Sequence, residues 1–364
     1  MARYRTIRDL DWPLVAITLA ICGVGVLQIY SATHGTVWHD AWWKQIVYVS
    51  AGLIGMWLMT KVDYHTLLGQ VPVLYGVTLA ALLTVLLVGV TVFGSRRWIP
   101  MPGGFHFQVS EFAKLVLVLL IARYMTELKG ERVEALDLLK LGGLIGVPML
   151  LVMKQPDLGT ALSYLPILAA GVLLAGVRWQ YLAAVVVLFA LVMPLSWRYV
   201  LKDYQRDRLL TFVDPGRDPR GSGYQVIQSQ IAVGSGGMWG KGVTRGYQTQ
   251  LRFLPVPHTD FIFSAFSEEH GFVGVVVALG LYFLLLMQIV QNAQTAPDRA
   301  GMYICMGVGA LLMFHVLVNV GMVVGRMPVT GIPLPLMSSG GSNTLSMFLM
   351  LGLVNNVRFR RFVN

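Results

Sequence analysis

One carboxylate stands out in the segment 253–263, which reads Phe-Leu-Pro-Val-Pro-His-Thr-Asp-Phe-Ile-Phe. Asp260 lies there among apolar residues, at the end of a long basic segment in a chain of long apolar runs. Removing a carboxylate charge from water is costly, so its position at such a boundary needs a reason. Proton abstraction or cation binding would be such a reason, and Asp260 is the first candidate for the reactive group. His258, two residues earlier, is expected to support it by orienting a substrate.

The segment 199–268 also carries cations and glycines of the kind that bind phosphate. Arg206 and Arg208 offer guanidinium groups, which bind phosphate through paired hydrogen bonds. Lys241 lies in the glycine-rich run 234–242, where backbone N–H groups could approach an anion closely. Together these residues predict a diphosphate site at a membrane surface. The alternative is a segment that is basic because it contacts lipid headgroups, with glycines that only let it bend. The run is no P-loop, because it lacks the Gly-x4-Gly-Lys-Ser/Thr order.

Ionisable residues occur at the ends of two further apolar runs. Glu111 and Lys114 are three apart, so they share one helix face and can pair. Ionisable groups in a span usually face a polar cavity, which makes both candidates for substrate binding. The alternative is that Ser110 caps the helix and the pair only neutralises itself. Asp157 could cap the helix after it or supply an oxygen to a metal. A divalent cation, Mg²⁺ or Mn²⁺, near Asp157 and Glu111 is therefore one hypothesis.

Two other segments are candidates for lining the same site. The run Arg96-Arg97-Trp98 could bind a headgroup and anchor the chain at the membrane interface, a common role for Trp. Ser338 lies in 333–342, where two prolines precede two glycines. This rigid-then-flexible turn would line the cavity, although the geometry of a hairpin alone would also explain it. Trp98 and Ser338 are therefore included among the predicted substrate-binding residues.

Four more polar residues fall in apolar runs. His315 and Asn319 are four apart on one run, and an interhelical hydrogen bond is their expected use. Glu268 and Glu269 are expected to begin a helix, where carboxylates favour the positive end of the helix dipole. That interpretation suffices for at least one of the two carboxylates.

The elements that position these residues follow from composition. The chain has 364 residues, of which 55% are hydrophobic and only 13% are charged, whereas soluble chains carry roughly 25% charged residues. Its mean hydropathy is +0.65, and the apolar residues form long blocks, which predicts membrane-spanning helices. A β-barrel would show short alternating segments instead. Cys22 and Cys305 both lie in apolar runs and form no CxxC pair, so neither a disulfide framework nor a cysteine metal site is expected.

Ten apolar runs predict ten transmembrane helices in an all-α polytopic membrane protein. The chain 1–364 is expected to be a single transmembrane domain, with 199–268 as a large extracytoplasmic loop before the eighth helix. No small-residue cleavage site follows the first run, so an uncleaved signal-anchor is expected. The predicted spans are 12–31, 43–60, 67–93, 110–127, 138–153, 158–176, 180–198, 269–291, 301–323 and 342–357.

The distribution of basic residues predicts the orientation. With the N-terminus inside, thirteen basic residues fall in cytoplasmic segments: Arg3, Arg5, Arg8, Lys61, Arg123, Lys129, Arg132, Lys140, Arg178, Arg299, Arg358, Arg360 and Arg361. Six fall at the outer face, with the long loop excluded: Lys44, Arg96, Arg97, Lys114, Lys154 and Arg326. This excess agrees with the positive-inside rule. Both termini are therefore expected in the cytoplasm, and the loop outside, together with 94–108 and 325–341.

The formal net charge of +10 could suggest a nucleic-acid partner. The basic residues, however, lie in interhelical segments and form no RNA- or DNA-binding motif. Membrane lipids or an anionic substrate explain them better, and no nucleic acid is expected.

Taken together, these motifs make the chain resemble the SEDS (shape, elongation, division, sporulation) family over nearly its whole length. The motifs are specific in combination: Arg97-Trp98, Gln108-x-Ser-Glu-x-x-Lys114, Gln155-Pro-Asp-Leu-Gly-Thr160, Gly223-Tyr…Gln228-Ser, Gly234-Ser-Gly-Gly-x-x-Gly-Lys-Gly242, His258-Thr-Asp-Phe-Ile-Phe263 and Pro333-x-Pro-x-x-Ser-x-Gly-Gly-Ser342. Two segments favour the elongation branch over the division branch, Tyr204-Gln-Arg-x-Arg208 and Gln248-Thr-Gln-Leu-Arg-Phe-Leu-Pro255. Val109 departs from the family, which usually has Pro there, a residue that favours a helix start.

The resemblance implies a peptidoglycan glycosyltransferase in the bacterial cytoplasmic (inner) membrane. Such enzymes polymerise lipid II, a disaccharide-pentapeptide on undecaprenyl diphosphate, for cell elongation and rod shape. They act with a class B penicillin-binding protein, a PBP2-type transpeptidase, within the elongation machinery. The family's invariant loop aspartate falls on Asp260. The alternatives are a lipid II flippase, a non-catalytic scaffold that activates the transpeptidase, and a member of the division branch.

Overall fold

The computed structural model describes residues 10–92, 95–101, 105–128, 130, 133–199, 203–218 and 221–361. Five basic residues that entered the orientation argument lie outside these ranges: Arg3, Arg5, Arg8, Lys129 and Arg132. The elements, contacts and exposures of the structure are those of these described residues.

All ten predicted spans are helical. Seven stretches are long and apolar enough to cross a membrane among the described residues, and one of them joins two helices, α7 and α8. The other three spans, α2, α5 and α15, hold polar and ionisable side chains along their lengths. The prediction of an all-α polytopic membrane protein is confirmed. The ten spans are α1 (Trp12–Thr33), α2 (Ala41–Lys61), α4 (Val71–Val88), α5 (Val109–Glu127), α6 (Ala135–Lys154), α7 (Leu158–Leu162) with α8 (Leu165–Ala175), α9 (Trp179–Tyr199), α13 (Ile262–Gln294), α14 (Arg299–Val323) and α15 (Gly341–Arg360).

Three spans differ from the prediction by more than about three residues at an end or by an internal break. The third begins with a separate short helix, α3 (Tyr64–Gly69), and its helix α4 ends at Val88 instead of continuing to residue 93. The sixth breaks between α7 and α8, where a proline occupies the first turn of α8. The eighth begins seven residues early, at Ile262, and breaks at Gly271, whose φ of 64° is left-handed. Local turn chemistry interrupts each apolar run at these points.

Two segments expected as loops contain secondary structure. The residues before α5 form a small antiparallel sheet in the order β1 (Val90–Val92), β2 (Ser95–Met101) and β3 (Phe105–Phe107). Ile99 pairs with Phe107 in its register. The segment 199–268 holds four helices before α13 begins: α10 (Asp203–Val213), the 3-10 turn η2 (Pro215–Arg217), α11 (Ser222–Ser235) and α12 (Tyr247–Gln250).

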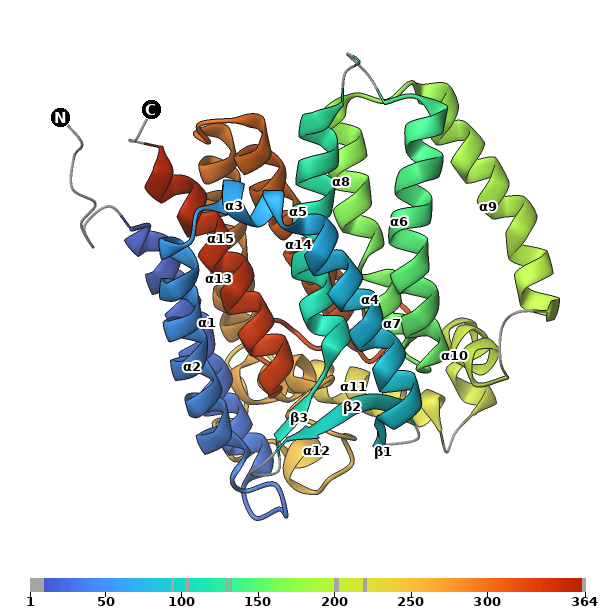
Figure 1. Ribbon diagram of the computed structural model, residues 1–364. Helices are drawn as coiled ribbons and strands as arrows, with labels where there is room; N and C mark the ends of the chain where they lie inside the picture. Colours follow the sequence, from blue (N-terminus) through green and yellow to red (C-terminus); the bar gives the residue numbers. More distant parts are fainter. Residues whose placement is uncertain are drawn as a thin grey trace.

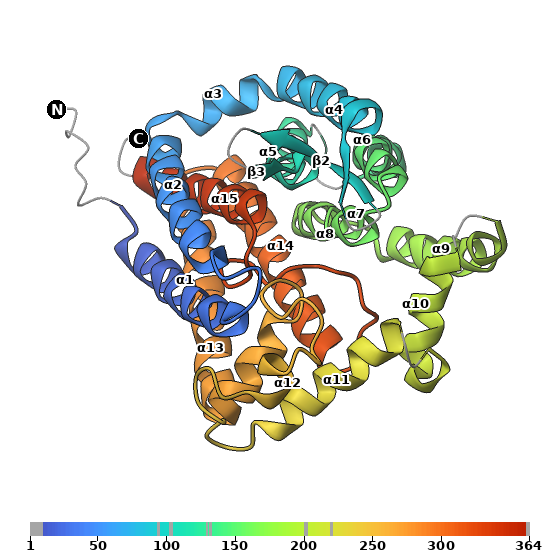
Figure 2. The same ribbon diagram turned by 90° about the horizontal axis from the view of Figure 1, so that it is seen from below.

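The helices pack into one bundle with two distinct ends. Helix α15 packs along α2 and also touches α5 and α14, while α13 packs between α1 and α14. Figure 1 shows the start of α1 and the end of α15 at one end of the bundle, with the sheet and α10–α12 at the opposite end. Figure 2 shows the bundle from that opposite end, which we call the loop end.

Helix α9 stands apart from the rest. Figures 1 and 2 show it projecting from the side of the bundle towards α10. None of its described side chains is buried, although the helix is apolar. A helix with apolar residues on every side is suited to lipid contact all round.

Candidate active site

Asp260 lies at the loop end, immediately before α13. Asn319 of α14 fixes its backbone, because the Asn319 amide donates hydrogen bonds to the Asp260 carbonyl at 2.9 Å and to the Ile332 carbonyl at 2.8 Å. The carboxylate itself accepts no hydrogen bond from the described residues and remains partly exposed. A Cβ added to Gly331 would lie 3.4 Å from the Asp260 Oδ2 atom, so the segment around Gly331 approaches the carboxylate closely. Asp260 is therefore held by its main chain and keeps its carboxylate available.

The surroundings of Asp260 raise its pKa above the usual value. Burial is the main cause, because it penalises the charged form. The positive charges of Arg97 and Arg208 lower the pKa, and the negative charge of Asp157 raises it. The sequence left the sign of this balance open. The resulting carboxyl group is a stronger base than a solvent-exposed aspartate.

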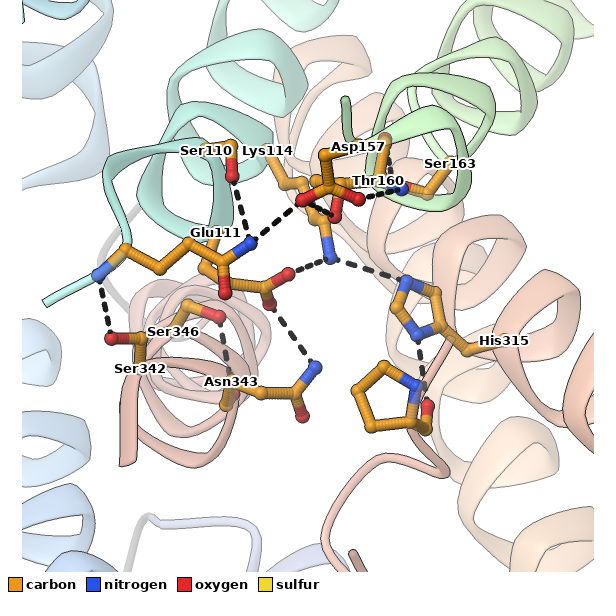
Figure 3. Close-up of polar contacts among 12 residues, drawn as sticks. Ser110, Glu111, Lys114, Asp157, Thr160, Ser163, His315, Ser342, Asn343 and Ser346 are labelled. Atoms are coloured by element: carbon orange, nitrogen blue, oxygen red, sulfur yellow. Dashed lines mark hydrogen bonds and ion pairs between the residues drawn. The ribbon is translucent and has the colours of Figure 1, made fainter. Parts of the chain in front are cut away.

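Asp157 joins this group through a dense set of hydrogen bonds. Its carboxylate caps α7 by accepting from the Thr160 N–H at 3.2 Å and from the Thr160 hydroxyl at 2.9 Å. It also accepts from the Gln108 amide at 2.9 Å and forms an ion pair with Arg97 at 3.2 Å. Figure 3 shows Asp157 surrounded by donors. The capping interpretation is thus correct, and Asp157 also links β2, α5 and α7.

Arg97 is the functional candidate that the sequence analysis missed. It was treated only as part of a headgroup-binding run, yet its guanidinium forms an ion pair with Asp157 and its charge acts on Asp260. Its Nε atom is buried and lacks a hydrogen-bond partner. A buried donor without a partner is costly, so it marks a place where a ligand could bind. Only the charge of Arg97 beside an aromatic residue hinted at this role in the sequence.

Glu111 and Lys114 form a buried ion pair deeper in the bundle. The Lys114 ammonium donates to the Glu111 carboxylate at 2.8 Å, and both side chains are almost fully buried. Asn343 of α15 donates to the other Glu111 oxygen at 3.1 Å. Lys114 also lies 3.3 Å from His315 Nε2 on α14, and the opposite ring nitrogen faces the Pro333 carbonyl. Figure 3 shows this chain of contacts crossing three helices.

His258 and Ser338 hold the segment that carries Asp260. The Ser338 hydroxyl donates to the Thr259 carbonyl at 2.7 Å and accepts from the Leu334 N–H at 2.9 Å. The His258 carbonyl accepts from the Ser339 N–H, and its ring lies 5.6 Å from that of Trp38. Burial lowers the pKa of His258 to about 4, so the ring is neutral at physiological pH. The supporting role expected for His258 is consistent with these contacts.

The remaining predicted residues lie at the edge of this group. Arg208 is close enough for its charge to act on Asp260. Arg206, on the same helix α10, instead reaches Asp203 at 3.5 Å and the Arg198 carbonyl at 3.2 Å. Trp98 lies on β2 with its ring edge-on to His106 and near the Arg97 guanidinium.

The glycine-rich run 234–242 does not have the geometry of an anion site. The backbone N–H groups of Lys241 and Gly242 donate to the carbonyls of Glu268 and Glu269, and the Gly240 N–H donates to Gly236. These three donors are therefore already satisfied within the protein. The prediction of an anion-binding turn is wrong for them.

Instead, this run supplies hydrogen-bond partners to the backbone at the break in α13. The Phe272 and Val273 N–H groups, freed by the break, donate to the carbonyls of Gly237 and Met238. The two backbone segments approach so closely that a Cβ on Gly271 would lie 2.3 Å from the Gly240 nitrogen. Glycine is required here by sterics as well as by its positive φ.

The Lys241 side chain also makes structural contacts beside the break in α13. Its ammonium donates to the Glu268 carboxylate and to the Ser235 hydroxyl, each at 2.8 Å. Within the described part of the chain, no contact joins Lys241 to Asp260. Its role in substrate binding stays a prediction that these contacts do not support.

Glu268 and Glu269 lie before the break in α13, so the expectation that they begin the span is wrong. Glu268 also accepts from the Thr249 N–H and hydroxyl. Glu269 accepts from the Ser31 hydroxyl of α1 at 2.6 Å. Both carboxylates are buried. Through these hydrogen bonds, Glu268 connects the segment that contains Thr249 to α13, and Glu269 connects α1 to α13.

The two residues predicted as metal ligands do not form a metal cage. Both Glu111 oxygens and both Asp157 oxygens already accept hydrogen bonds from protein donors. Among the described residues no group of three His, Cys, Asp or Glu side chains could hold a metal ion. The residues as they lie do not fit a dedicated divalent-cation site.

The chain is similar to known proteins over almost its whole length. A family model described as cell cycle protein, FtsW/RodA/SpoVE, matches residues 12–361. The peptidoglycan glycosyltransferase MrdB of Escherichia coli (strain K12) is 38% identical over 362 residues, covering 97% of this chain and 94% of that protein. The peptidoglycan glycosyltransferase RodA of Treponema pallidum (strain Nichols) is 33% identical, covering 99% of this chain and 100% of that protein.

The fold is also similar to a solved structure described as "Structural coordination of polymerization and crosslinking by a peptidoglycan synthase complex". The TM-score is 0.84 at 34% sequence identity, covering 98% of this chain and 99% of that chain. The similarity therefore includes the loop end as well as the helix bundle.

Proposed function

The chain belongs to the FtsW/RodA/SpoVE family of cell cycle proteins, and from that membership we propose that it is a peptidoglycan glycosyltransferase that polymerises lipid II. The glycan would grow by β-1,4 linkages, with undecaprenyl diphosphate as the leaving group. The observation that carries this proposal is the arrangement at the loop end. There, a partly exposed carboxylate with a raised pKa, Asp260, lies beside the cations Arg97 and Arg208.

Asp260 would act as the general base. The 4-hydroxyl of the acceptor GlcNAc is too weakly acidic to attack unaided, so Asp260 would accept its proton. The sugar oxygen would then attack C1 of the donor MurNAc and displace the lipid diphosphate. A single displacement inverts the α-linked donor to a β link, through a transition state that resembles an oxocarbenium ion, as in glycoside hydrolysis.

The cations near Asp260 would stabilise the departing diphosphate. Electrostatic stabilisation of developing charge is usually the largest catalytic contribution. Arg97 and Arg208 are the best placed for it, because both charges already act on Asp260. Arg206 lies two residues from Arg208 on the same helix and therefore on a different face, whereas Lys114 is buried against Glu111.

A requirement for Mg²⁺ or Mn²⁺ remains a separate proposal. Mg²⁺ is commonly bound by one or two carboxylates together with substrate phosphates. Glu111 and Asp157 would have to exchange their present hydrogen bonds to contribute. The mechanism above therefore contains no step through a metal. Polymerisation that persists in chelator would exclude the requirement.

We also propose the cytoplasmic (inner) membrane as the location, with both termini in the cytoplasm. The excess of basic residues in the segments that the sequence predicts to be cytoplasmic supports this orientation. The loop end would then face outward, where lipid II is polymerised. The partner would be a class B penicillin-binding protein of the PBP2 type within the elongation machinery. The similarity to a chain of a peptidoglycan synthase complex supports such a partner.

The decisive experiment measures glycan polymerisation from purified lipid II. Wild type and Asp260→Asn would each be assayed with and without the class B partner. Polymer from wild type only, with both proteins folded, supports the glycosyltransferase. If neither makes polymer with the partner present, a lipid II flippase becomes the better explanation. A transbilayer assay of labelled lipid II then tests that alternative directly.

A further inference from the structure

A cavity lies at the end of the bundle opposite Asp260. Its volume is about 540 Å³, within the range of sites for small ligands. It opens between the end of α8, the end of α13 and the start of α14, and its apolar walls include Leu174, Val290, Met302 and Met306. The turn from α13 to α14 is bonded to α3 through Tyr64, which places the cavity at the end of the bundle where α1 begins and α15 ends (Figure 1). None of the proposed catalytic residues lines it.

The walls of this cavity suit a hydrocarbon chain. Leu174 is 42% exposed and belongs to an apolar face of α8. The two methionines are partly buried, and their flexible, polarizable side chains adapt to irregular apolar ligands. In a membrane-spanning bundle an apolar opening of this kind faces acyl chains.

The rim of the cavity carries one available positive charge. Arg299 is exposed, and its guanidinium makes no hydrogen bond or ion pair with any other described residue. Its neighbour Asp298 also lines the cavity but forms no ion pair with it among the described residues, and its carboxylate accepts from the Tyr64 hydroxyl at 2.9 Å and the Gly301 N–H at 2.7 Å. Asp298 also lies 2.6 Å from His65 Nε2. The Arg299 guanidinium is therefore free to bind an anion beside an apolar cavity.

We propose that this cavity binds an anionic phospholipid, with the lipid phosphate on Arg299 and one acyl chain between α8 and α14. Guanidinium groups bind phosphate through paired hydrogen bonds. Basic pockets between transmembrane helices on the cytoplasmic side recognise anionic headgroups. A zwitterionic phospholipid would offer the same chains without the net negative charge. The site is independent of the glycosyltransferase reaction, and its lipid would bridge α8, α13 and α14.

The test compares lipid adducts of the purified full-length chain by native mass spectrometry. Phosphatidylglycerol and phosphatidylcholine with identical chains are the probes. Wild type is expected to retain phosphatidylglycerol in preference, and Arg299→Ala is expected to lose about five-fold of that binding. Met302→Trp fills the apolar part of the cavity and is expected to reduce binding without removing charge. Lys140→Ala removes an exposed charge of α6 outside the cavity and is expected to bind as wild type does.

Three results would overturn the proposal. Equal retention of both phospholipids by wild type would show that no anion is recognised. Unchanged phosphatidylglycerol binding in Arg299→Ala, or in a folded Met302→Trp variant, would place the lipid elsewhere. Displacement of phosphatidylglycerol by undecaprenyl phosphate would identify the occupant as the isoprenoid lipid instead.

Discussion

Lys241 and Glu268 form an ion pair of 2.8 Å between the glycine-rich run and the first part of α13. Glu268 is fully buried, whereas Lys241 is 23% exposed. The same carboxylate accepts from the backbone N–H groups of Gln248 and Thr249. The buried Glu268 carboxylate, eight residues after Asp260, thus holds the loop at Lys241 and at the backbone of residues 248–249.

Breaking this pair is expected to destabilise the protein. Lys241→Met leaves the Glu268 charge buried without its cation, which costs about 3 kcal/mol for a pair of this kind. The midpoint of thermal unfolding in detergent measures the loss. Lys140→Met, on the exposed face of α6, serves as the control and should unfold as wild type does. A Lys241→Met variant of unchanged stability would show that the pair contributes little.

Asp260→Asn is expected to fold and to lose activity. Loss of a general base typically slows a reaction ~100- to 10,000-fold, and lipid II polymerisation measures it. Asp40→Asn changes an exposed carboxylate of the α1–α2 turn, which also lies at the loop end, and should keep full activity. Near-normal rates in Asp260→Asn would exclude the proposed base.

The raised pKa of Asp260 also predicts the direction of a stability change. The folded protein binds a proton at Asp260 more readily than the unfolded chain does. Stability therefore falls as pH rises through the interval from the unfolded to the folded pKa. Asp260→Asn removes that dependence and should be at least as stable as wild type at neutral pH.

Arg97→Gln is expected to move the pH dependence of turnover. The base is active when deprotonated, so the rate rises with pH through the pKa of Asp260. Because the Arg97 charge lowers that pKa, its loss should shift the acidic limb of the kcat/KM profile to higher pH. Arg96→Gln, one residue away, is the matched control. An unshifted limb in Arg97→Gln would separate Arg97 from the base.

The Glu111–Lys114 pair allows structural and catalytic roles to be distinguished. Lys114→Met should destabilise the protein by about 3 kcal/mol, because it removes one partner of a buried ion pair. The double variant Glu111→Leu/Lys114→Met should recover most of that stability. If its polymerisation rate recovers as well, the pair is structural. A stable but inactive double variant would support a role in substrate binding.

Gly271→Ala tests the backbone break in α13 and its contact with the glycine-rich run. Alanine would need a positive φ, at a cost of about 1–2 kcal/mol, and its Cβ would collide with the Gly240 nitrogen. The unfolding temperature should fall clearly. Gly280→Ala, on the same helix with open space around its Cβ, should be neutral or stabilising. Equal behaviour of the two variants would argue against the left-handed break.

The sequence was sufficient for the spans and for Asp260. Long apolar runs determine membrane helices because the bilayer leaves the backbone few alternatives. A carboxylate in an apolar boundary segment is conspicuous for its cost alone. Both features are local in the sequence, and the ten helical spans confirm the prediction of membrane helices. The role of Asp260 remains a prediction for the polymerisation assay.

Contacts between distant segments could not be predicted in the same way. The glycines of 234–242 would have the same sequence pattern in an anion-binding turn and in a segment hydrogen-bonded to a broken helix. Only the position of the α13 backbone distinguishes these two roles. Arg97 gained its importance from Asp157 and Asp260, which are far away in sequence. Composition carries no information on which distant residues meet.

The isolation of α9 has a consequence for how the chain assembles. Among the described residues, no apolar side chain between Val172 and Val226 belongs to the buried core. The packing that holds the bundle together therefore comes from two pieces, one on each side of α9. The helix acts as a covalent tether that keeps these pieces at high local concentration. A gene split within α9 would then yield two separately inserted fragments able to reassemble the same core.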